Sequence, residues 1–324
     1  MNNKKGAIVA IEPKSGEILS LVSGPSYDPN LLVGRDRSKN YFSLYKDSIF
    51  TPLIDKSLLS NFPAGSPFKI INGLIGLEEG VINDKSTIFC NGSYIYGKNK
   101  KSMKCHCSGG YKNIYSAISE SCNSFFAETY VKIINKNSNI NKNFDDWSEN
   151  VKSFGLGNFL NNDLPIGKKG VIPNSDFYNN WYPDFRWGAL TTLSNSIGQG
   201  EILVTPIQLA NMISVVANKG YYYTPHVIKN IEGDSISNRF SQKKITKIDK
   251  KFFDKVEIGL FDVFLNGTAK QLKVKGIDIC GKSGTAENFT KINGKKTQLT
   301  DHSIFVAYAP KDNPKIAIAV VVEN

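Results

Sequence analysis

The chain has 324 residues, 40% of them hydrophobic and 11% aromatic, with 40 lysines and arginines against 29 aspartates and glutamates. This composition supports a substantial buried core and excludes a disordered chain. The formal net charge of +11 comes from lysines spread along the sequence, without the continuous basic run typical of nucleic-acid binding, so we expect no nucleic-acid partner. No apolar stretch approaches the roughly 18 residues that a membrane-spanning helix needs, and residues 1–6 lack the apolar core of a signal peptide.

The first part of the chain predicts a β-hairpin, an irregular segment and a helix. Residues 6–23 form two apolar arms around a Pro-Lys-Ser-Gly turn, which is typical of a hairpin. Residues 24–60 contain three prolines, and we expect irregular structure there because proline interrupts helices. Between residues 68 and 77, apolar side chains recur on one face, which predicts an amphipathic helix.

The middle of the chain predicts mainly helices and loops. Residues 84–111 are polar and contain several Gly and Cys, which favours a loop, whereas residues 112–135 favour a helix. Several short helices are expected from there to about residue 190. Residues 205–208, Thr-Pro-Ile-Gln, form a capping box with proline at the first helical position, so a helix is expected to run from there to Gly220.

The last part of the chain predicts an extended segment at residues 221–231, a helix at 249–266, and then a series of strands. The strands are expected at residues 277–281, 303–309 and 315–322. Strands at both ends of the chain with helices between them predict an α+β domain. Its terminal strands should share one central antiparallel sheet flanked by helices.

The sequence SPFK at residues 66–69 is the first of three short motifs that carry groups suited to acyl transfer. A spacing of three on a helix places the Lys69 amine and the Ser66 hydroxyl on one face. Serine is a weak nucleophile until a base takes its proton, and a lysine can do this when burial lowers its pKa. Residues 43–46 and 241–244 match the same pattern, but only Ser66 follows a Pro-Ala-Gly turn and precedes an apolar helix face.

The second and third motifs carry groups that can bind substrate and move protons. Ser121 and Asn123 are two residues apart, and from a loop between helices Ser121 can relay a proton while Asn123 binds a substrate amide. Residues 282–285, Lys-Ser-Gly-Thr, follow a predicted strand, and Gly284 would let a substrate backbone lie close alongside.

In this order the three motifs resemble the Ser-x-x-Lys, Ser-x-Asn and Lys-Thr/Ser-Gly motifs of the penicillin-recognising serine acyltransferases. The resemblance extends over nearly the whole chain to class B penicillin-binding proteins of the elongation type, penicillin-binding protein 2. It is carried by the stretches GAIVAIEPKSGEILSLVSGPSYDPN, FPAGSPFK, AISESCNSFF, SIGQGEILVTPIQLAN, GKSGTAE and VAYAPKDNPKIAIAVVVEN. It implies a penicillin-binding/serine β-lactamase-like transpeptidase fold with an all-helical subregion, formed by residues 1–324 as one transpeptidase domain.

The same resemblance implies a reaction. Ser66 would attack the penultimate D-alanine of a peptidoglycan stem peptide, release the terminal D-alanine and pass the acyl group to an amine of a neighbouring stem. Lys69 would be the base, while Ser121 and Asn123 would shape the cleft and assist proton movement. β-Lactams would acylate Ser66 as substrate mimics, and no metal or organic cofactor would take part in the chemistry. The substrate carboxylate would be bound around Lys282, Ser283, Gly284 and Thr285, with the Ser66 and Thr285 N–H groups as the oxyanion hole.

Four cysteines cluster in the sequence at Cys90, Cys105, Cys107 and Cys122. Four thiolates suit a tetrahedral structural zinc, and Cys105 and Cys107 are too close in sequence for an easy disulfide. Some members of the resembled family hold zinc near the Ser-x-Asn loop, which implies that a zinc here would fix Ser121 and Asn123. His106 is a possible substitute ligand. Disulfides or free buried thiols are the alternatives in an exported domain.

By resemblance, the protein acts in cell-wall elongation with a membrane glycosyltransferase as partner. The family is anchored in the inner membrane with this domain in the periplasm. The anchor, the pedestal domain and the helix after the last strand have no counterpart in residues 1–324. We therefore expect one apolar face of the sheet to be partly uncovered.

Two other functions fit parts of the same evidence. A serine β-lactamase needs a group that activates water, and no Glu-x-x-Leu-Asn pattern occurs between Ser121 and Lys282. A truncated, non-catalytic β-lactam-binding or scaffold domain is favoured only by the missing segments.

Overall fold

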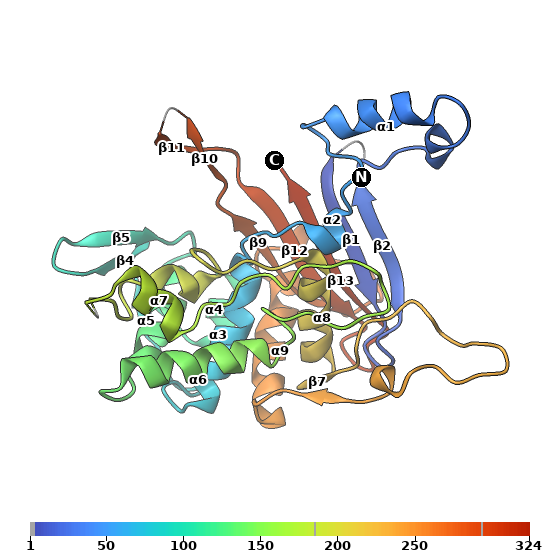
Figure 1. The fold of residues 1–324 in the computed structure, drawn as a ribbon. Helices are drawn as coiled ribbons and strands as arrows, with labels where there is room; N and C mark the ends of the chain where they lie inside the picture. Colours follow the sequence, from blue (N-terminus) through green and yellow to red (C-terminus); the bar gives the residue numbers. More distant parts are fainter. Residues whose placement is uncertain (1–3, 185, 293) are drawn as a thin grey trace.

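A five-stranded antiparallel sheet carries both ends of the chain in the computed structural model, which describes residues 4–184, 186–292 and 294–324 (Figure 1). The terminal strands pair along their whole length, from Lys5 opposite Glu323 to Ile11 opposite Ala317. This confirms the predicted sheet of terminal strands. In spatial order the strands are β2 (Ile18–Gly24), β1 (Lys5–Ile11), β13 (Ile316–Glu323), β12 (His302–Ala309) and β9 (Cys280–Ala286).

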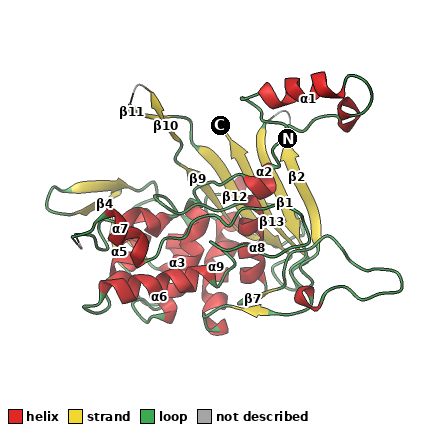
Figure 2. Cartoon of the chain, in the orientation of Figure 1, coloured by secondary structure: helices red, strands yellow, loops and turns green. Residues whose placement is uncertain are grey.

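Helices gather on one side of this sheet (Figure 2). Helix α8 (Pro206–Ala217) packs on β1 and β13, and every one of its residues is buried. It begins with the predicted capping box, in which the Thr205 N–H donates to Gln208 Oε1 at 3.0 Å. Helix α9 (Lys250–Leu265) packs on β9, and α3 (Lys69–Glu78) lies beside α9. None of the helices in the described parts of the chain combines the length and apolar character needed to cross a membrane.

Four further helices form the predicted helical subregion around α3. They are α4 (Ile114–Ser119), α5 (Asn123–Ile134), α6 (Ile140–Lys152) and α7 (Ser175–Trp181). Residues 112–135 were expected to form one helix, but the chain is interrupted at Ser121, whose φ of 59° no helix allows. This break makes Ser121 and Asn123 available at a turn between α4 and α5.

Two expectations of irregular structure are wrong. Residues 24–60 contain η1 (Pro29–Leu32), α1 (Arg37–Lys46) and α2 (Lys56–Leu59). The prolines flank α1 rather than interrupt it, and none of its residues is buried. Residues 84–111 hold short strands instead of a loop, because two pairs of them form small antiparallel ladders. These strands are β3 (Ile88–Cys90), β4 (Ser93–Tyr96), β5 (Lys101–Lys104) and β6 (Gly110–Lys112).

The C-terminal third also differs from the prediction in detail. Of residues 221–231, only β7 (Tyr221–Tyr222) forms a strand, which pairs with β8 (Lys244–Ile245). A hairpin of β10 (Phe289–Ile292) and β11 (Lys295–Gln298), which the sequence did not predict, follows β9. An apolar hollow of about 230 Å³ lies on the sheet beside Phe305, Ile316 and Ile318.

Asn72 of α3 links three helical elements inside the core through side-chain hydrogen bonds. Its amide donates to the backbone oxygens of Asn195 at 3.1 Å and Ser196 at 2.8 Å, both in η3 (Leu193–Ile197). Its Oδ1 accepts a hydrogen bond from the indole Nε1 of Trp147 in α6 at 2.8 Å. Asn72 and Trp147 are fully buried, so water cannot replace these bonds if one partner is lost.

We expect Asn72→Ala to lower the free energy of unfolding by about 3 kcal/mol or more, because each buried group left without a partner costs about 1–3 kcal/mol. Urea unfolding followed by tryptophan fluorescence measures the change. Asn91→Ala, at an exposed position, is the matched control and should stay within about 0.5 kcal/mol of wild type. Equal stability of the two variants would contradict this account of the core.

Candidate active site

Ser66 stands at the start of a helical run, where η2 (Ser66–Phe68) leads into α3. Gly65 before it has a φ of 60° and a ψ of −158°, which suits glycine alone. A Cβ at Gly65 would lie 2.8 Å from the Thr285 oxygen, so β9 passes directly over this turn. Because Ser66 is the first residue of the run, its N–H points out of the helix and is available to an anion.

Lys69 and Ser66 are joined through Ser121. The Lys69 Nζ donates to Ser121 Oγ at 3.0 Å, to the Ser121 backbone oxygen at 2.8 Å and to Asn123 Oδ1 at 2.5 Å. The Ser121 hydroxyl in turn donates to Ser66 Oγ at 3.1 Å. Within the described part of the chain, no hydrogen bond joins Lys69 directly to Ser66. The structure therefore brings the first two motifs together, with Ser121 between the amine and the candidate nucleophile.

Two buried lysines shape the electrostatics of this site. Burial lowers the pKa of Lys69 to about 8, although negative charge on Cys105, Cys122 and Cys107 opposes the effect. Lys282 is also fully buried, and burial together with the charge of Lys69 holds its pKa well below the usual lysine value. A larger neutral fraction of Lys69 is therefore present near neutral pH than for a lysine in water.

The third motif lies within β9, not after a strand as the sequence predicted. The strand begins three residues later than expected, at Cys280, and runs through the motif to Ala286. The Lys282 Nζ donates to the Ser283 backbone oxygen at 2.8 Å. The Ser283 hydroxyl shares a hydrogen bond of 2.8 Å with the Thr268 hydroxyl. β9 pairs with β12 on one side only, so its other edge is open along the serine turn.

Gly284 sets the distance between β9 and the nucleophile turn. A Cβ at this position would lie 2.6 Å from Pro67 Cδ and 3.0 Å from the Ser66 nitrogen. Only glycine fits there without moving the buried Pro67. Thr285 follows Gly284 and is exposed. All three motifs, widely separated in sequence, therefore converge on Ser66.

The segment after η3 also supports the site, and motif reasoning gave it no role. The Gly65 N–H donates to the Gly198 oxygen at 2.8 Å, and a Cβ at Gly198 would lie 2.4 Å from the Gly65 oxygen. The Gln199 amide donates to the Thr285 oxygen at 3.3 Å. This segment therefore contacts both the serine turn and β9. In the sequence, only the two closely spaced glycines of SIGQG, residues 196–200, indicate this contact segment.

The four clustered cysteines meet in space, with all Sγ atoms within 4.8 Å of one another. The Sγ atoms of Cys105 and Cys107 are 3.5 Å apart, those of Cys107 and Cys90 3.5 Å, and those of Cys105 and Cys122 3.7 Å. A disulfide needs about 2.05 Å, whereas a zinc with Zn–S bonds of about 2.3 Å places its sulfurs about 3.8 Å apart. The donor set therefore fits a tetrahedral zinc. His106 is exposed and lies outside the group.

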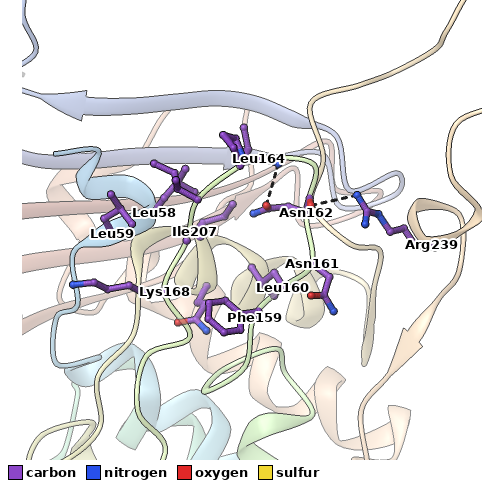
Figure 3. Close-up of a pocket in the computed structure, with 14 residues that line it drawn as sticks. Leu58, Leu59, Phe159, Leu160, Asn161, Asn162, Leu164, Lys168, Ile207 and Arg239 are labelled. Atoms are coloured by element: carbon purple, nitrogen blue, oxygen red, sulfur yellow. Dashed lines mark hydrogen bonds between the residues drawn. The ribbon is translucent and has the colours of Figure 1, made fainter. Parts of the chain in front are cut away.

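A separate cavity of about 450 Å³ lies on another part of the molecule (Figure 3). Leu58, Leu59 and Ile207 form part of its wall, and Arg239 at its edge donates to the Asn162 backbone oxygen at 3.4 Å. None of the motif residues lines it. Its lining comes from α2, α8, Arg239 and residues between 159 and 168.

A family model described as the penicillin binding protein transpeptidase domain matches residues 6–324. The chain therefore belongs to this family. Peptidoglycan D,D-transpeptidase MrdA of Acinetobacter baumannii is 33% identical over 334 residues, which cover 99% of this chain and 48% of the relative. MrdA of Escherichia coli K12 is 29% identical over 335 residues, covering 99% and 51%. The chain thus spans about half the length of these curated relatives.

Solved structures confirm the predicted fold. Pseudomonas aeruginosa PBP2, in complex with WCK 5153, matches with a TM-score of 0.83 and 33% identity over 100% of this chain and 67% of that chain. Helicobacter pylori PBP2, in complex with MreC, matches with a TM-score of 0.82 and 27% identity over 99% of this chain and 57% of that chain. The resemblance to penicillin-binding protein 2 found in the sequence is confirmed by these relatives.

Proposed function

We propose that this chain is a serine D,D-transpeptidase that cross-links peptidoglycan through an acyl-enzyme on Ser66. The observation that carries the proposal is the hydrogen-bonded series Lys69 Nζ, Ser121 Oγ and Ser66 Oγ, with steps of 3.0 and 3.1 Å. It supplies a nucleophile with a path for its proton to a buried amine. The relatives named as peptidoglycan D,D-transpeptidases support the choice of reaction.

In the acylation step, neutral Lys69 receives the Ser66 proton through Ser121 while Ser66 Oγ attacks the carbonyl carbon of the penultimate D-alanine. The N–H groups of Ser66 and Thr285 stabilise the resulting oxyanion. The peptide C–N bond then breaks, and the proton held by Lys69 returns through Ser121 to the leaving D-alanine nitrogen. An ester between Ser66 and the donor peptide remains.

In the second step, an amine of a neighbouring stem peptide attacks the ester carbon. A new amide bond forms, the bond to Ser66 Oγ breaks, and the amine proton restores the Ser66 hydroxyl through the same Ser121 and Lys69 groups. The donor carboxylate is bound near Lys282, whose amine is held by the backbone of β9, with the hydroxyls of Ser283 and Thr285 beside it. Asn123 binds a donor amide.

We also propose that Cys90, Cys105, Cys107 and Cys122 hold a structural zinc. The support is the sulfur geometry, together with a hydrogen bond from the Asn123 N–H to Cys105 Sγ at 3.0 Å. Cys122 lies between Ser121 and Asn123, so a metal bound there would fix both side chains relative to Lys69. The zinc would take no part in the reaction itself.

Residues 1–324 would serve as the transpeptidase domain of an elongation machinery at the periplasmic side of the inner membrane. The Helicobacter pylori relative binds MreC, and another similar structure is part of a peptidoglycan synthase complex. The synthase complex, which coordinates polymerization and crosslinking, supports the membrane glycosyltransferase that the family resemblance implies as partner, and the MreC complex supports MreC as a second partner. β-Lactam binding is supported by the same membership of the penicillin-binding family.

Mass spectrometry after treatment with benzylpenicillin tests the role of Ser66. Wild type should gain the mass of one penicillin, and Ser66→Ala should gain none, because the acyl bond forms on this hydroxyl. Ser43→Ala removes the serine of a second Ser-x-x-Lys pattern and is the matched control, which should label fully. Labelling of Ser66→Ala would refute the assignment.

A peptide assay separates the three functions. A donor and acceptor peptide pair should be cross-linked by wild type. Labelling without cross-linking would favour the scaffold function, and sustained nitrocefin turnover would favour a β-lactamase.

The rate of Ser66 acylation should rise with pH with its midpoint near pH 8, because only the deprotonated Lys69 amine accepts a proton and its pKa is lowered to about 8. Stopped-flow acylation by a fluorescent penicillin between about pH 6 and pH 10 measures this. Lys69→Arg keeps the charge and should lose both the rate and its pH dependence. A midpoint at the ordinary lysine value of 10.5 would contradict the burial argument.

Metal analysis of the purified protein should find about one zinc per chain, because four thiolates complete the coordination. Cys90→Ser should lower the zinc content strongly. Cys280→Ser, at a buried cysteine outside the cluster, is the control and should retain it. Protein purified with zinc present but containing none would end the proposal.

A further inference from the structure

One stretch of the sequence, residues 85–119, contains six lysines and neither aspartate nor glutamate. Four of these lysines lie on the hairpin of β4 and β5, residues 93–104, which we call the lysine hairpin. They are Lys98, Lys100, Lys101 and Lys104, and all four are exposed. Within the described parts of the chain none of the four forms an ion pair, so their charge is available to a ligand.

The lysine hairpin forms one wall of a cavity of about 520 Å³. Lys98, Lys101 and Tyr96 line this wall, while Tyr182 and Ser194 line the wall across from it. The volume suits a small peptide fragment. The cavity therefore combines cationic groups with aromatic surface, a combination that binds an anionic peptide.

None of the motif residues lines this cavity, but residues of the lysine hairpin and residues after η3, next to its two walls, contact the groups around Ser66. The Asn123 amide donates to the Lys104 oxygen at 2.6 Å, at the end of the lysine hairpin. The Tyr94 hydroxyl of the hairpin donates to Glu128 Oε2 in α5 at 2.9 Å. The opposite wall contains Ser194 of η3, whose following residues contact the Ser66 turn. Figure 1 shows the hairpin projecting from the helical side of the molecule, apart from β9.

Cross-linking needs two peptides at Ser66, and β9 provides a place for only one of them. The donor lies along the open edge of β9, where Gly284 allows close approach. The second peptide then needs another approach to Ser66. Ser121 contacts Ser66 and Asn123 contacts the lysine hairpin, so these elements, which are separate from β9, border such an approach.

We propose that the cavity beside the lysine hairpin is the acceptor subsite, and that Lys98 and Lys101 bind carboxylates of the acceptor stem peptide. The inference rests on the proposed function, since it names the second substrate of that reaction. The cationic wall also disfavours the protonated form of the acceptor amine, because like charges repel. The bound amine is then delivered as the nucleophile, and the tyrosine rings pack against the peptide between its charged groups.

Binding of an acceptor-type tripeptide tests the inference without any reaction. The probe is a fluorescently labelled tripeptide with a free amine and free carboxylates that lacks the terminal D-alanines, so it cannot act as a donor. We expect the double variant Lys98→Gln/Lys101→Gln to weaken its binding about 5- to 10-fold in fluorescence anisotropy, since each exposed pair contributes modestly. A twin peptide with its carboxylates converted to amides should bind wild type and variant equally.

The matched control is Lys85→Gln/Lys250→Gln, which removes two charges at exposed positions outside the cavity and should bind like wild type. Penicillin labelling of Ser66 should be unchanged in both double variants. Equal tripeptide binding by Lys98→Gln/Lys101→Gln and wild type overturns the acceptor subsite, whatever the state of Ser66. A different result would overturn the proposed function. If the tripeptide binds in a way that depends on these lysines but wild type forms no penicillin adduct, the peptide-binding site stands without the transpeptidase reaction.

Discussion

The arrangement around Ser66 depends on the cost of burying the amine of Lys69. Lys69 as a whole is 1% exposed, and a buried ammonium needs all three of its hydrogens to be bound. Ser121 and Asn123 supply the three acceptors, so the turn between α4 and α5 is held against α3. The left-handed φ of Ser121 is maintained by these bonds. The same contacts that satisfy the amine therefore place the Ser121 hydroxyl beside Ser66.

Each part of the fold and of the site geometry that the sequence predicted correctly is marked by a pattern within a short stretch of residues. Short apolar runs at both ends of the chain mark the terminal strands, and the Thr205 capping box marks the start of α8. The motif around Ser66 and Lys69 lies within one helical turn, so its geometry follows from helix spacing alone. The cysteine cluster is also predicted from residue type, and the structure places the four sulfurs within 4.8 Å of one another, with His106 outside the group.

The parts that the sequence did not predict depend on contacts between distant segments. The hairpin of β4 and β5 looks like a polar loop because its lysines face solvent on both sides and give no alternation. The hydrogen bonds of Ser121 to both Ser66 and Lys69 need the break between α4 and α5, which a continuous helical pattern conceals. Gln199 contacts Thr285 from the segment after η3, and η3 is held by hydrogen bonds from Asn72. No short window of sequence contains these partners.

The pairing of β1 with β13 has a consequence for how the domain folds. Lys5 and Glu323 are register partners, so the sheet joins two segments that are separated by almost the whole domain. Until β13 is in place, β1 with β2 and β12 with β9 are two separate pairs of strands with open edges. Closing such a long loop is entropically costly and slow. The helices around α3 can pack without this closure, whereas the sheet that carries Lys282 becomes continuous only when β13 has paired with both β1 and β12.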